Sequence, residues 1–260
     1  MTARILAVTN QKGGVGKTTS VVNIAASLVD LGKRALLVDL DPQGNATTGS
    51  GIDKTKLRYS VYHLLLEQAT LPEVTVPSPT GGYQVLPANR ELAGAEVELV
   101  DGERREYRLR QALEKVSEDY DVVLIDCPPA LNLLTINGLA AAWRVLIPMQ
   151  CEYYALEGLS DLVQTIRRVR GNLNPKLEIE GLVRTMVDPR NALSLQVSAQ
   201  LEQHFGAKVY GTPIPRNVRL AEAPSHGQPV LRYDASSKGA QAYLQLTREM
   251  LARFGTSTVA

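Results

Sequence analysis

Two lysines and two threonines stand in a glycine-rich stretch near the N-terminus, where residues 10–19 read Asn-Gln-Lys-Gly-Gly-Val-Gly-Lys-Thr-Thr. Glycines let backbone N–H groups approach an anion, and the start of a following helix adds partial positive charge. In such a loop the ammonium group of Lys17 reaches the β- and γ-phosphates of a nucleotide, and the Thr18 hydroxyl holds Mg²⁺. The residues expected around the phosphates are Gly13, Gly14, Val15, Gly16, Lys17, Thr18 and Thr19.

This stretch departs from the usual phosphate-loop pattern, G-x-x-x-x-G-K-[ST], at its beginning. Gln11 occupies the position of the first glycine, and Lys12 adds a second lysine directly before the glycines. The alternative is a glycine-rich turn with incidental lysines. The order of the features argues against this alternative. It is the order that a nucleotide site needs: an apolar run, the turn with both lysines, the threonine and a helical pattern.

Aspartates end two further apolar runs. Residues 121–129 read Asp-Val-Val-Leu-Ile-Asp-Cys-Pro-Pro, so a buried strand ends at Asp126 before two prolines force the chain into a loop. A carboxylate in this position orients Mg²⁺, often through a water molecule. Asp41 follows another apolar run, 35–38, in a loop rich in turn-forming residues. A strand-terminal aspartate is common by itself, but together with the upstream loop Asp126 indicates a magnesium–nucleotide site.

Strands and helices alternate along the chain and would position these residues. Apolar runs predict strands near 5–8, 35–38, 83–87, 121–126, 145–148, 177–186 and 209–213. Helical spacing predicts helices over 21–28, 60–66, 92–100, 107–116, 156–169, 193–205 and 240–254. This alternation implies an α/β fold with a mostly parallel twisted sheet flanked by helices on both faces. We expect one domain over 1–260, with 254–260 as a flexible tail.

Composition limits the function classes. The 260 residues are 44% hydrophobic and 21% charged, which suffices for a full core in a soluble protein. The net charge of +1 means that any basic patch must be local. Cys127 and Cys151 alone indicate neither a zinc site nor a disulfide framework. We find no room for a signal peptide and no run of 18 apolar residues, so we expect a cytoplasmic protein.

Several separated segments resemble the ParA/MinD family of P-loop ATPases, which has a deviant Walker A motif. The resemblance is most specific to the short chromosomal ParA proteins, also called Soj. The matching segments are 12–18, 38–45, 124–129, 185–190 and 214–227, which run through nearly the whole chain. Val187 replaces an aromatic residue that is common in relatives, and Pro189 precedes Arg190, so the shape of this one loop is expected to differ.

The resemblance implies an ATPase that uses ATP and Mg²⁺ and that dimerises around two ATP molecules. In such a dimer Lys12 would reach the partner's phosphates, and Asp41 would position the attacking water. Phosphoryl transfer needs positioning and charge neutralisation more than a strong base, which is compatible with both roles. Pro215 and Asn217 lie where the family usually holds adenine. The alternative for them is a loop proline and a helix-capping asparagine.

The resemblance also implies a function in chromosome or plasmid partitioning. The ATP-bound homodimer would bind double-stranded DNA without sequence preference, in association with the nucleoid, and a ParB-like centromere-binding protein would stimulate hydrolysis and release it. Residues 163–232 contain ten Lys and Arg against five Asp and Glu, which agrees with a local basic face. Arg190 and Arg219 would lie on that face. The alternative is a solvated surface on which both arginines form ion pairs.

Two other function classes fit the sequence less well. A membrane-associated ATPase like MinD needs a basic amphipathic helix at its C-terminus, but residues 248–260 hold only two arginines and a small polar tail. We therefore expect no membrane partner. An electron carrier like the nitrogenase reductase needs cysteines from each subunit for an iron–sulfur cluster. Cys127 lies inside the strand end at Asp126, which leaves only Cys151.

Overall fold

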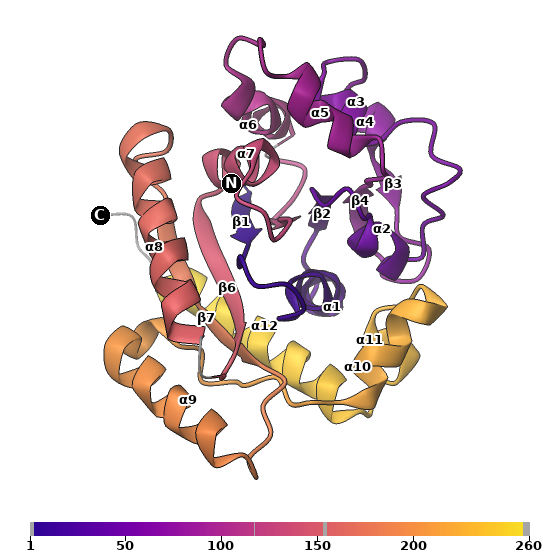
Figure 1. Cartoon of the computed structure of the whole chain (residues 1–260). Coiled ribbons are helices and arrows are strands. Elements are labelled where there is room, and N and C mark those ends of the chain that lie inside the picture. The colour runs from indigo at the N-terminus through magenta and orange to yellow at the C-terminus, as the bar shows by residue number, and fades with distance from the viewer. Residues whose placement is uncertain (1–2, 117, 153–154, 257–260) are drawn as a thin grey trace.

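A seven-stranded sheet in the order β3-β4-β2-β5-β1-β6-β7 forms the centre of the protein (Figure 1). The computed structural model describes residues 3–116, 118–152 and 155–256. The strands are β1 (Arg4–Val8), β2 (Ala35–Asp39), β3 (Val76–Pro77), β4 (Gln84–Leu86), β5 (Val122–Asp126), β6 (Arg144–Gln150) and β7 (Glu178–Thr185). Neighbouring strands run parallel, except that β3 pairs antiparallel with β4 at one edge.

Helices connect the strands and cover both faces of the sheet. Those in the first half of the chain are α1 (Lys17–Asp30), α2 (Asn45–Gly49), α3 (Val61–Leu65), α4 (Leu71–Val74), α5 (Leu92–Glu98), η1 (Arg105–Tyr107) and α6 (Arg108–Glu114). Those in the second half are α7 (Leu133–Ala141), α8 (Ala155–Asn172), α9 (Ala192–Phe205), η2 (Gly206–Lys208), α10 (Val218–Glu222), η3 (Ala223–His226), α11 (Val230–Tyr233) and α12 (Lys238–Thr256).

Each face of the sheet has its own hydrophobic core. On one face Val38 and Ile125 pack with residues of α3 and of α5 to α9, and on the other Leu37 and Leu124 pack with residues of α1, α11 and α12. Side chains of a strand point alternately to its two faces, so a strand covered on both needs apolar residues at every position. This explains the continuously apolar runs that made β1, β2 and β5 recognisable in the sequence.

The structure confirms the predicted fold class, but several elements differ from the sequence analysis. Helix α7 was not predicted, and neither were the short elements α2, α4, β3, α10, η3 and α11. The strand predicted over 209–213 is wrong, because Val209 forms only an isolated bridge with Leu182. Residues 254–256, which were expected to belong to a flexible tail, are part of α12, and Phe254 is buried. Residues 257–260 of that tail lie outside the described part of the chain.

None of the described helices is both long enough and apolar enough to span a lipid bilayer.

Candidate nucleotide site

The glycine-rich loop leaves β1 after Val8 and enters α1 at Lys17. Gly14 and Gly16 adopt φ angles of 72° and 89°, in the left-handed region that favours glycine. Between them Val15 is buried, and its carbonyl oxygen accepts a hydrogen bond of 2.8 Å from the Thr185 hydroxyl at the end of β7. The loop is therefore fixed to the sheet from behind, and its glycines give it the shape that exposes backbone N–H groups to an anion.

The side chain of Lys17 lies under this loop. Lys17 is 7% exposed, and its Nζ donates a hydrogen bond of 3.1 Å to the carbonyl oxygen of Lys12. Burial lowers the pKa of Lys17, and the nearby Asp126 carboxylate opposes that shift. An ammonium group held in the concave side of such a loop has the charge and position needed to bind phosphate oxygens.

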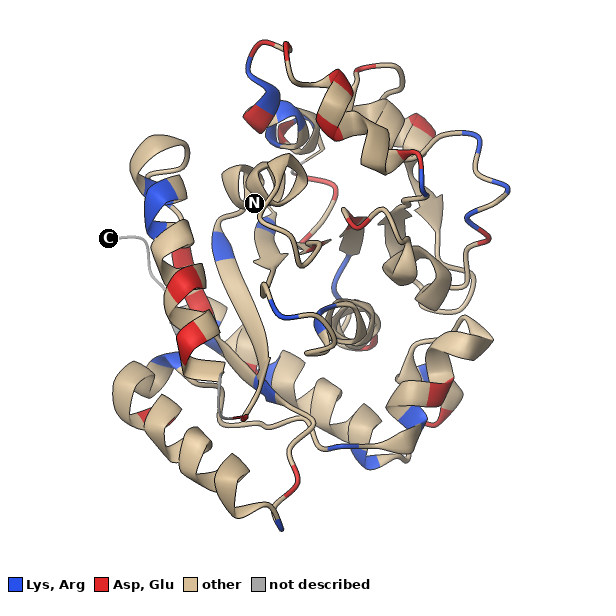
Figure 2. Cartoon of the chain, viewed as in Figure 1, with Lys and Arg blue, Asp and Glu red and all other residues tan. Residues whose placement is uncertain are grey.

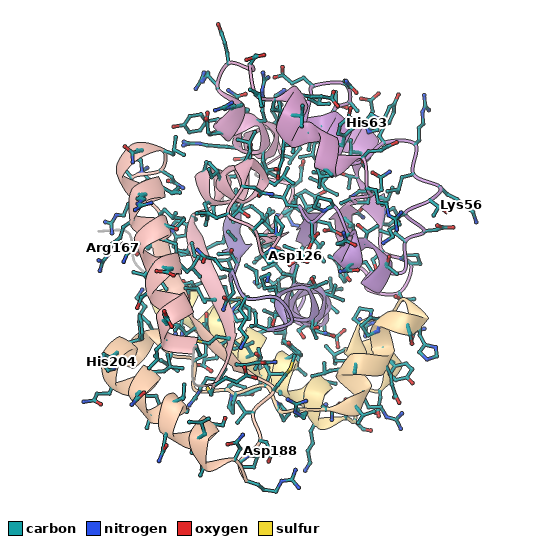
Figure 3. The ribbon with its side chains drawn as sticks, in the orientation of Figure 1. Lys56, His63, Asp126, Arg167, Asp188 and His204 are labelled. Atoms are coloured by element: carbon teal, nitrogen blue, oxygen red, sulfur yellow. The ribbon has the colours of Figure 1, made fainter. Side chains whose placement is uncertain are left out.

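Asp126 ends β5 in the interior of the protein, near the centre of Figure 3. Its Oδ2 accepts a hydrogen bond of 2.7 Å from the Thr18 hydroxyl, whereas its buried Oδ1 has no hydrogen-bond partner among the described residues. Burial, and then the charge of Asp39, raise the pKa of Asp126 well above its ordinary value. A hydroxyl beside an unpaired carboxylate oxygen is a set of hard oxygen donors, so these residues fit a magnesium ion.

Asp41 lies beside this pair, on the loop that follows β2. The strand register places Asp39 opposite Asp126, so the ends of β2 and β5 are level. Two residues further on, Asp41 is partly buried, and its Oδ1 accepts a hydrogen bond of 2.9 Å from the N–H of Gln43. Asp41 is close enough for its charge to act on both Lys17 and Asp126. The structure thus brings Lys17, Thr18, Asp126 and Asp41 to one edge of the sheet.

Lys12 points away from this group. Its side chain is 46% exposed and forms an ion pair with Glu152, just after β6. The Lys12 N–H donates a hydrogen bond of 3.0 Å to Asn10 Oδ1, which helps to fix the turn. A lysine on the outside of the loop is accessible to a second molecule, which is compatible with the role predicted for Lys12. The pairing of Glu152 with Lys12 was not predicted from the sequence, because 140 positions separate the two residues.

Pro215 and Asn217 form the entry to α10. Asn217 is the N-cap residue, and its Oδ1 accepts a hydrogen bond of 3.0 Å from the N–H of Arg219. The alternative role of helix capping is therefore present. Capping uses the side-chain oxygen, and adenine recognition could use the amide nitrogen, so the two roles are compatible. Pro215 is half-buried and forms a bridge with Val187. Contact of these two residues with adenine stays a prediction.

A cavity of about 260 Å³ opens beside the loop, between α1, α2 and η3. Thr18 and Thr19 line it, together with Asn23 and other described residues, but Pro215 and Asn217 do not. The start of α1 therefore has open space next to it on the side of α2.

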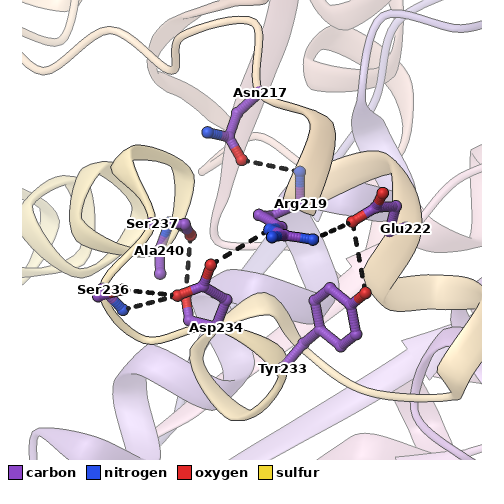
Figure 4. A network of polar contacts seen from close by, with 8 residues as sticks. All are labelled: Asn217, Arg219, Glu222, Tyr233, Asp234, Ser236, Ser237 and Ala240. Carbon is purple, nitrogen blue, oxygen red and sulfur yellow. Dashed lines mark hydrogen bonds and ion pairs between the residues drawn. The ribbon is translucent and has the colours of Figure 1, made fainter.

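The two arginines predicted to contact DNA both form ion pairs with nearby acids. Arg190 has a side chain that is 88% exposed, and its Nη2 lies 2.7 Å from Oδ2 of Asp188. Figure 4 shows Arg219 between two carboxylates, with its Nη1 2.8 Å from Glu222 and its Nε 3.3 Å from Asp234. The ion pairs weighed as an alternative are thus present, and DNA contact stays a prediction.

Sequence reasoning missed two residues that fix the site. The Thr185 hydroxyl holds the glycine-rich loop by donating a hydrogen bond to the carbonyl oxygen of Val15. Asp39 holds the loop that follows β2, because its Oδ1 accepts a hydrogen bond of 3.1 Å from the N–H of Asp41. Thr185 begins the matching segment 185–190, but its contact with the loop was not predicted. Asp39 did have a signal, because it ends a buried apolar run as Asp126 does.

The chain is similar to known proteins along most of its length. A family model described as an AAA domain matches residues 3–179. The chromosome partitioning protein ParA of Caulobacter vibrioides is 53% identical over 252 residues, covering 96% of this chain and 94% of that protein. The sporulation initiation inhibitor protein Soj of Bacillus subtilis is 53% identical over 249 residues, covering 96% and 98%.

A solved structure is similar over nearly the whole chain. It is described as cobyrinic acid a,c-diamide synthase from Mycobacterium smegmatis with a bound ATP analogue and magnesium. It is 41% identical, covers 98% of this chain and 97% of its own, and superposes with a TM-score of 0.87. The extent of these matches confirms the family predicted from the sequence: the chain belongs to the ParA/Soj family of P-loop ATPases.

Proposed function

We propose that this protein is a DNA-partitioning ATPase for chromosome or plasmid segregation. ATP binding produces a homodimer that binds double-stranded DNA without sequence preference, and a ParB-like protein stimulates hydrolysis and releases it. The observation that carries this proposal is the 53% identity, over 96% of the chain, with a chromosome partitioning protein. The protein would act in the cytoplasm, in association with the nucleoid.

The nucleotide site supports the ATPase part of this proposal. Lys17 and the N–H groups of the loop bind the phosphates of ATP, with Gly13, Gly14, Val15, Gly16 and Thr19 completing the loop. Thr18 would hold Mg²⁺, and Asp126 would orient it. Magnesium supplies charge neutralisation for the phosphates when it is bound. Thr18 and Asp126 are already in contact at 2.7 Å, which supports a preformed place for the ion.

Asp41 orients the attacking water in this proposal, and Lys12 contacts the nucleotide of the partner subunit. Two observations support these roles: Asp41 is near Lys17 and Asp126, and Lys12 is on the outside of the loop. A lysine that acts only in the dimer would couple assembly to hydrolysis. Pro215 and Asn217 hold the adenine, with Asn217 using the side-chain nitrogen that capping does not need.

DNA binding is assigned to Arg190 and Arg219. In the view of Figure 2 acidic and basic residues lie intermixed along the ribbon. We assign the phosphate contacts to individual exposed arginines, whose number doubles when two subunits assemble on one duplex. The exposed arginines Arg167, Arg168 and Arg170 of α8 add to the local positive charge.

Co-sedimentation with DNA tests the proposed function. The wild-type protein is mixed with two unrelated duplexes in the presence of ATP, ADP or no nucleotide, with and without a candidate ParB-like protein. We expect ATP-dependent binding to both duplexes, and release when the ParB-like protein is added. Lys17→Ala should bind DNA in none of these conditions, because no nearby residue replaces its charge at the phosphates. Equal binding with ATP and with ADP would contradict the proposal.

A further inference from the structure

The loop that carries Asp41 is held at both ends by one buried side chain, that of Asp39. We propose that Asp39 is a positioning residue for ATP hydrolysis, which acts by fixing the segment 40–46 so that Asp41 stands in place to orient water. This inference rests on the proposed function of Asp41 and adds a second residue to the reaction.

The contacts of Asp39 divide between the two ends of that segment. Its Oδ1 accepts a hydrogen bond of 3.1 Å from the N–H of Asp41. Its Oδ2 accepts two hydrogen bonds from Thr47, one of 2.8 Å from the N–H and one of 2.7 Å from the hydroxyl. One carboxylate therefore connects the end of β2 with the middle of α2. Its Oδ1 binds the start of the segment and its Oδ2 binds the end.

Thr47 extends this connection to the next strand of the sheet. Its hydroxyl donates to Asp39 and also accepts a hydrogen bond of 2.9 Å from the N–H of Ala88, just beyond β4. Gly44 turns the loop with a φ of 61°, and a Cβ there would lie 2.6 Å from the Ala88 carbonyl oxygen. The loop is thus packed directly against the chain after β4, with little room for another path.

Burying a carboxylate at this turn costs free energy, because the charged group loses its contact with water. Asp39 is 0% exposed, and burial raises its pKa to about 6 although three hydrogen bonds oppose the shift. It also lies opposite Asp126, so two carboxyl groups end adjacent strands. An apolar residue would cost less free energy in this position. A requirement for two acceptor oxygens aimed at two loop ends explains why an aspartate is there.

Substitution of Asp39 tests the inference by separating turnover from ATP affinity. In Asp39→Asn one acceptor oxygen becomes an NH₂ group, which faces an N–H donor and releases one end of the loop. We expect kcat to fall at least about 10-fold while ATP affinity, measured with a fluorescent ATP analogue, stays within about two-fold. Hydrogen–deuterium exchange should become faster at the amides of residues 40–47, which reports the released loop directly.

Variants of Thr47 form a second series of substitutions. They test the role of Asp39 even if Asp39→Asn does not fold. Thr47→Val removes the hydroxyl between Asp39 and Ala88 and should reproduce the loss of kcat and the faster exchange. Thr47→Ser keeps the hydroxyl and should restore both. Thr247→Val is the matched control, because it also removes a fully buried threonine hydroxyl, but on α12. It should leave kcat unchanged.

Asp41→Ala separates failure of the inference from failure of the proposed function. If Asp41→Ala hydrolyses ATP at the wild-type rate, the role of Asp41 is wrong and the inference falls with it. If Asp41→Ala is slow while the folded variants of Asp39 and Thr47 turn over normally, only the inference is overturned. Equal loss of kcat in Thr247→Val, or an equal loss in Thr47→Ser and Thr47→Val, would reduce Asp39 to a structural residue and overturn it as well.

Discussion

Asp126 is a buried carboxylate with one oxygen hydrogen-bonded to Thr18 and the other without a partner among the described residues. Asp39 lies opposite it in the strand register and is also fully buried. Two adjacent carboxyl groups away from water destabilise a fold unless a cation joins them. The site is therefore arranged to bind a cation. Without that cation the two carboxyl groups lower the stability of the nucleotide-free protein.

Asp126→Asn should raise the stability of the nucleotide-free protein and remove its ATPase activity. The amide oxygen can still accept the hydrogen bond from Thr18, but the buried charge of Asp126 is gone and Asp39 has no second carboxylate beside it. We expect an increase of about 1–2 kcal/mol in the free energy of unfolding, measured at pH 7 without magnesium. Asp121→Asn is the control at the other end of the same segment, where the carboxylate is paired with Arg34 near the surface. A gain in both variants, or in neither, would contradict this account of Asp126.

At the scale of elements, the parts that the sequence predicted are those whose signal is local. The glycine-rich loop with Lys17 and Thr18 is one continuous motif, and Asp126 ends a run that is apolar because β5 is covered on both faces. Glu152, just after β6, and Thr185, at the end of β7, contact the loop from far along the chain, so the residues next to them do not reveal these contacts. The Asp188 partner of Arg190 is two residues away and could have been noticed.

Helix α7 was missed because it has no polar face. It lies between α6, α8 and β1, and most of its residues are buried. A helix that is covered all round lacks the 3.6-residue alternation by which amphipathic helices are recognised. The opposite error occurred at 209–213, where a short apolar segment with Gly211 and Pro213 was interpreted as a strand, although only Val209 bridges the sheet.

The close packing of α7 on the sheet gives a prediction for Gly138. A Cβ at this position would lie 2.9 Å from the Cys127 sulfur, 3.3 Å from Leu40 and 3.4 Å from Ile125, all of them buried. Gly138→Ala should therefore destabilise the protein by about 1–3 kcal/mol in urea unfolding, because overpacking outweighs the gain in helix propensity. Leu40 directly precedes Asp41, so ATP turnover is expected to fall as well.

Gly158 in α8 is the matched control for Gly138. An added Cβ meets no atom within 4 Å there. Gly158→Ala should stabilise the protein by about 0.5–1 kcal/mol, which is the ordinary helical preference for alanine. The two substitutions by alanine should thus change the stability in opposite directions, although both glycines lie inside helices. If Gly138→Ala were as stabilising as Gly158→Ala, the contact of α7 with Cys127 would be looser than the structure indicates.

At the scale of the whole molecule, Lys12 connects one subunit to the assembly. Lys12→Gln should keep ATP affinity in the monomer, because Lys17 and the loop remain, but should lose the ATP-dependent dimer in size-exclusion chromatography. Mixing Lys12→Gln with Asp41→Ala tests action between subunits, since each would supply what the other lacks at one of the two sites. Lys56→Gln, which removes an exposed lysine paired with Asp53, should dimerise normally. Absence of any asymmetric rescue would place the action of Lys12 within its own subunit.

DNA binding is the whole-molecule property that depends on Arg190 and Arg219. Each arginine is paired with carboxylates in the free protein, so contact with a phosphate requires exchanging one anion for another. Release of condensed counterions favours this exchange at low salt. Arg190→Ala and Arg219→Ala should each weaken binding to all sequences equally, and each should flatten the log–log salt dependence by about one unit for every DNA phosphate that a subunit no longer neutralises. ATP hydrolysis without DNA should change little.

Asp188→Ala distinguishes a phosphate-binding Arg190 from an arginine that only forms a surface ion pair. Removing this carboxylate frees the guanidinium group and takes a negative charge away from the DNA, so binding should become stronger and its salt dependence should not become flatter. A pair that has no part in DNA binding predicts instead that Arg190→Ala and Asp188→Ala leave affinity and slope unchanged. Affinities measured with ATP at several salt concentrations on two unrelated duplexes separate these outcomes, because only a DNA contact moves the two variants in opposite directions.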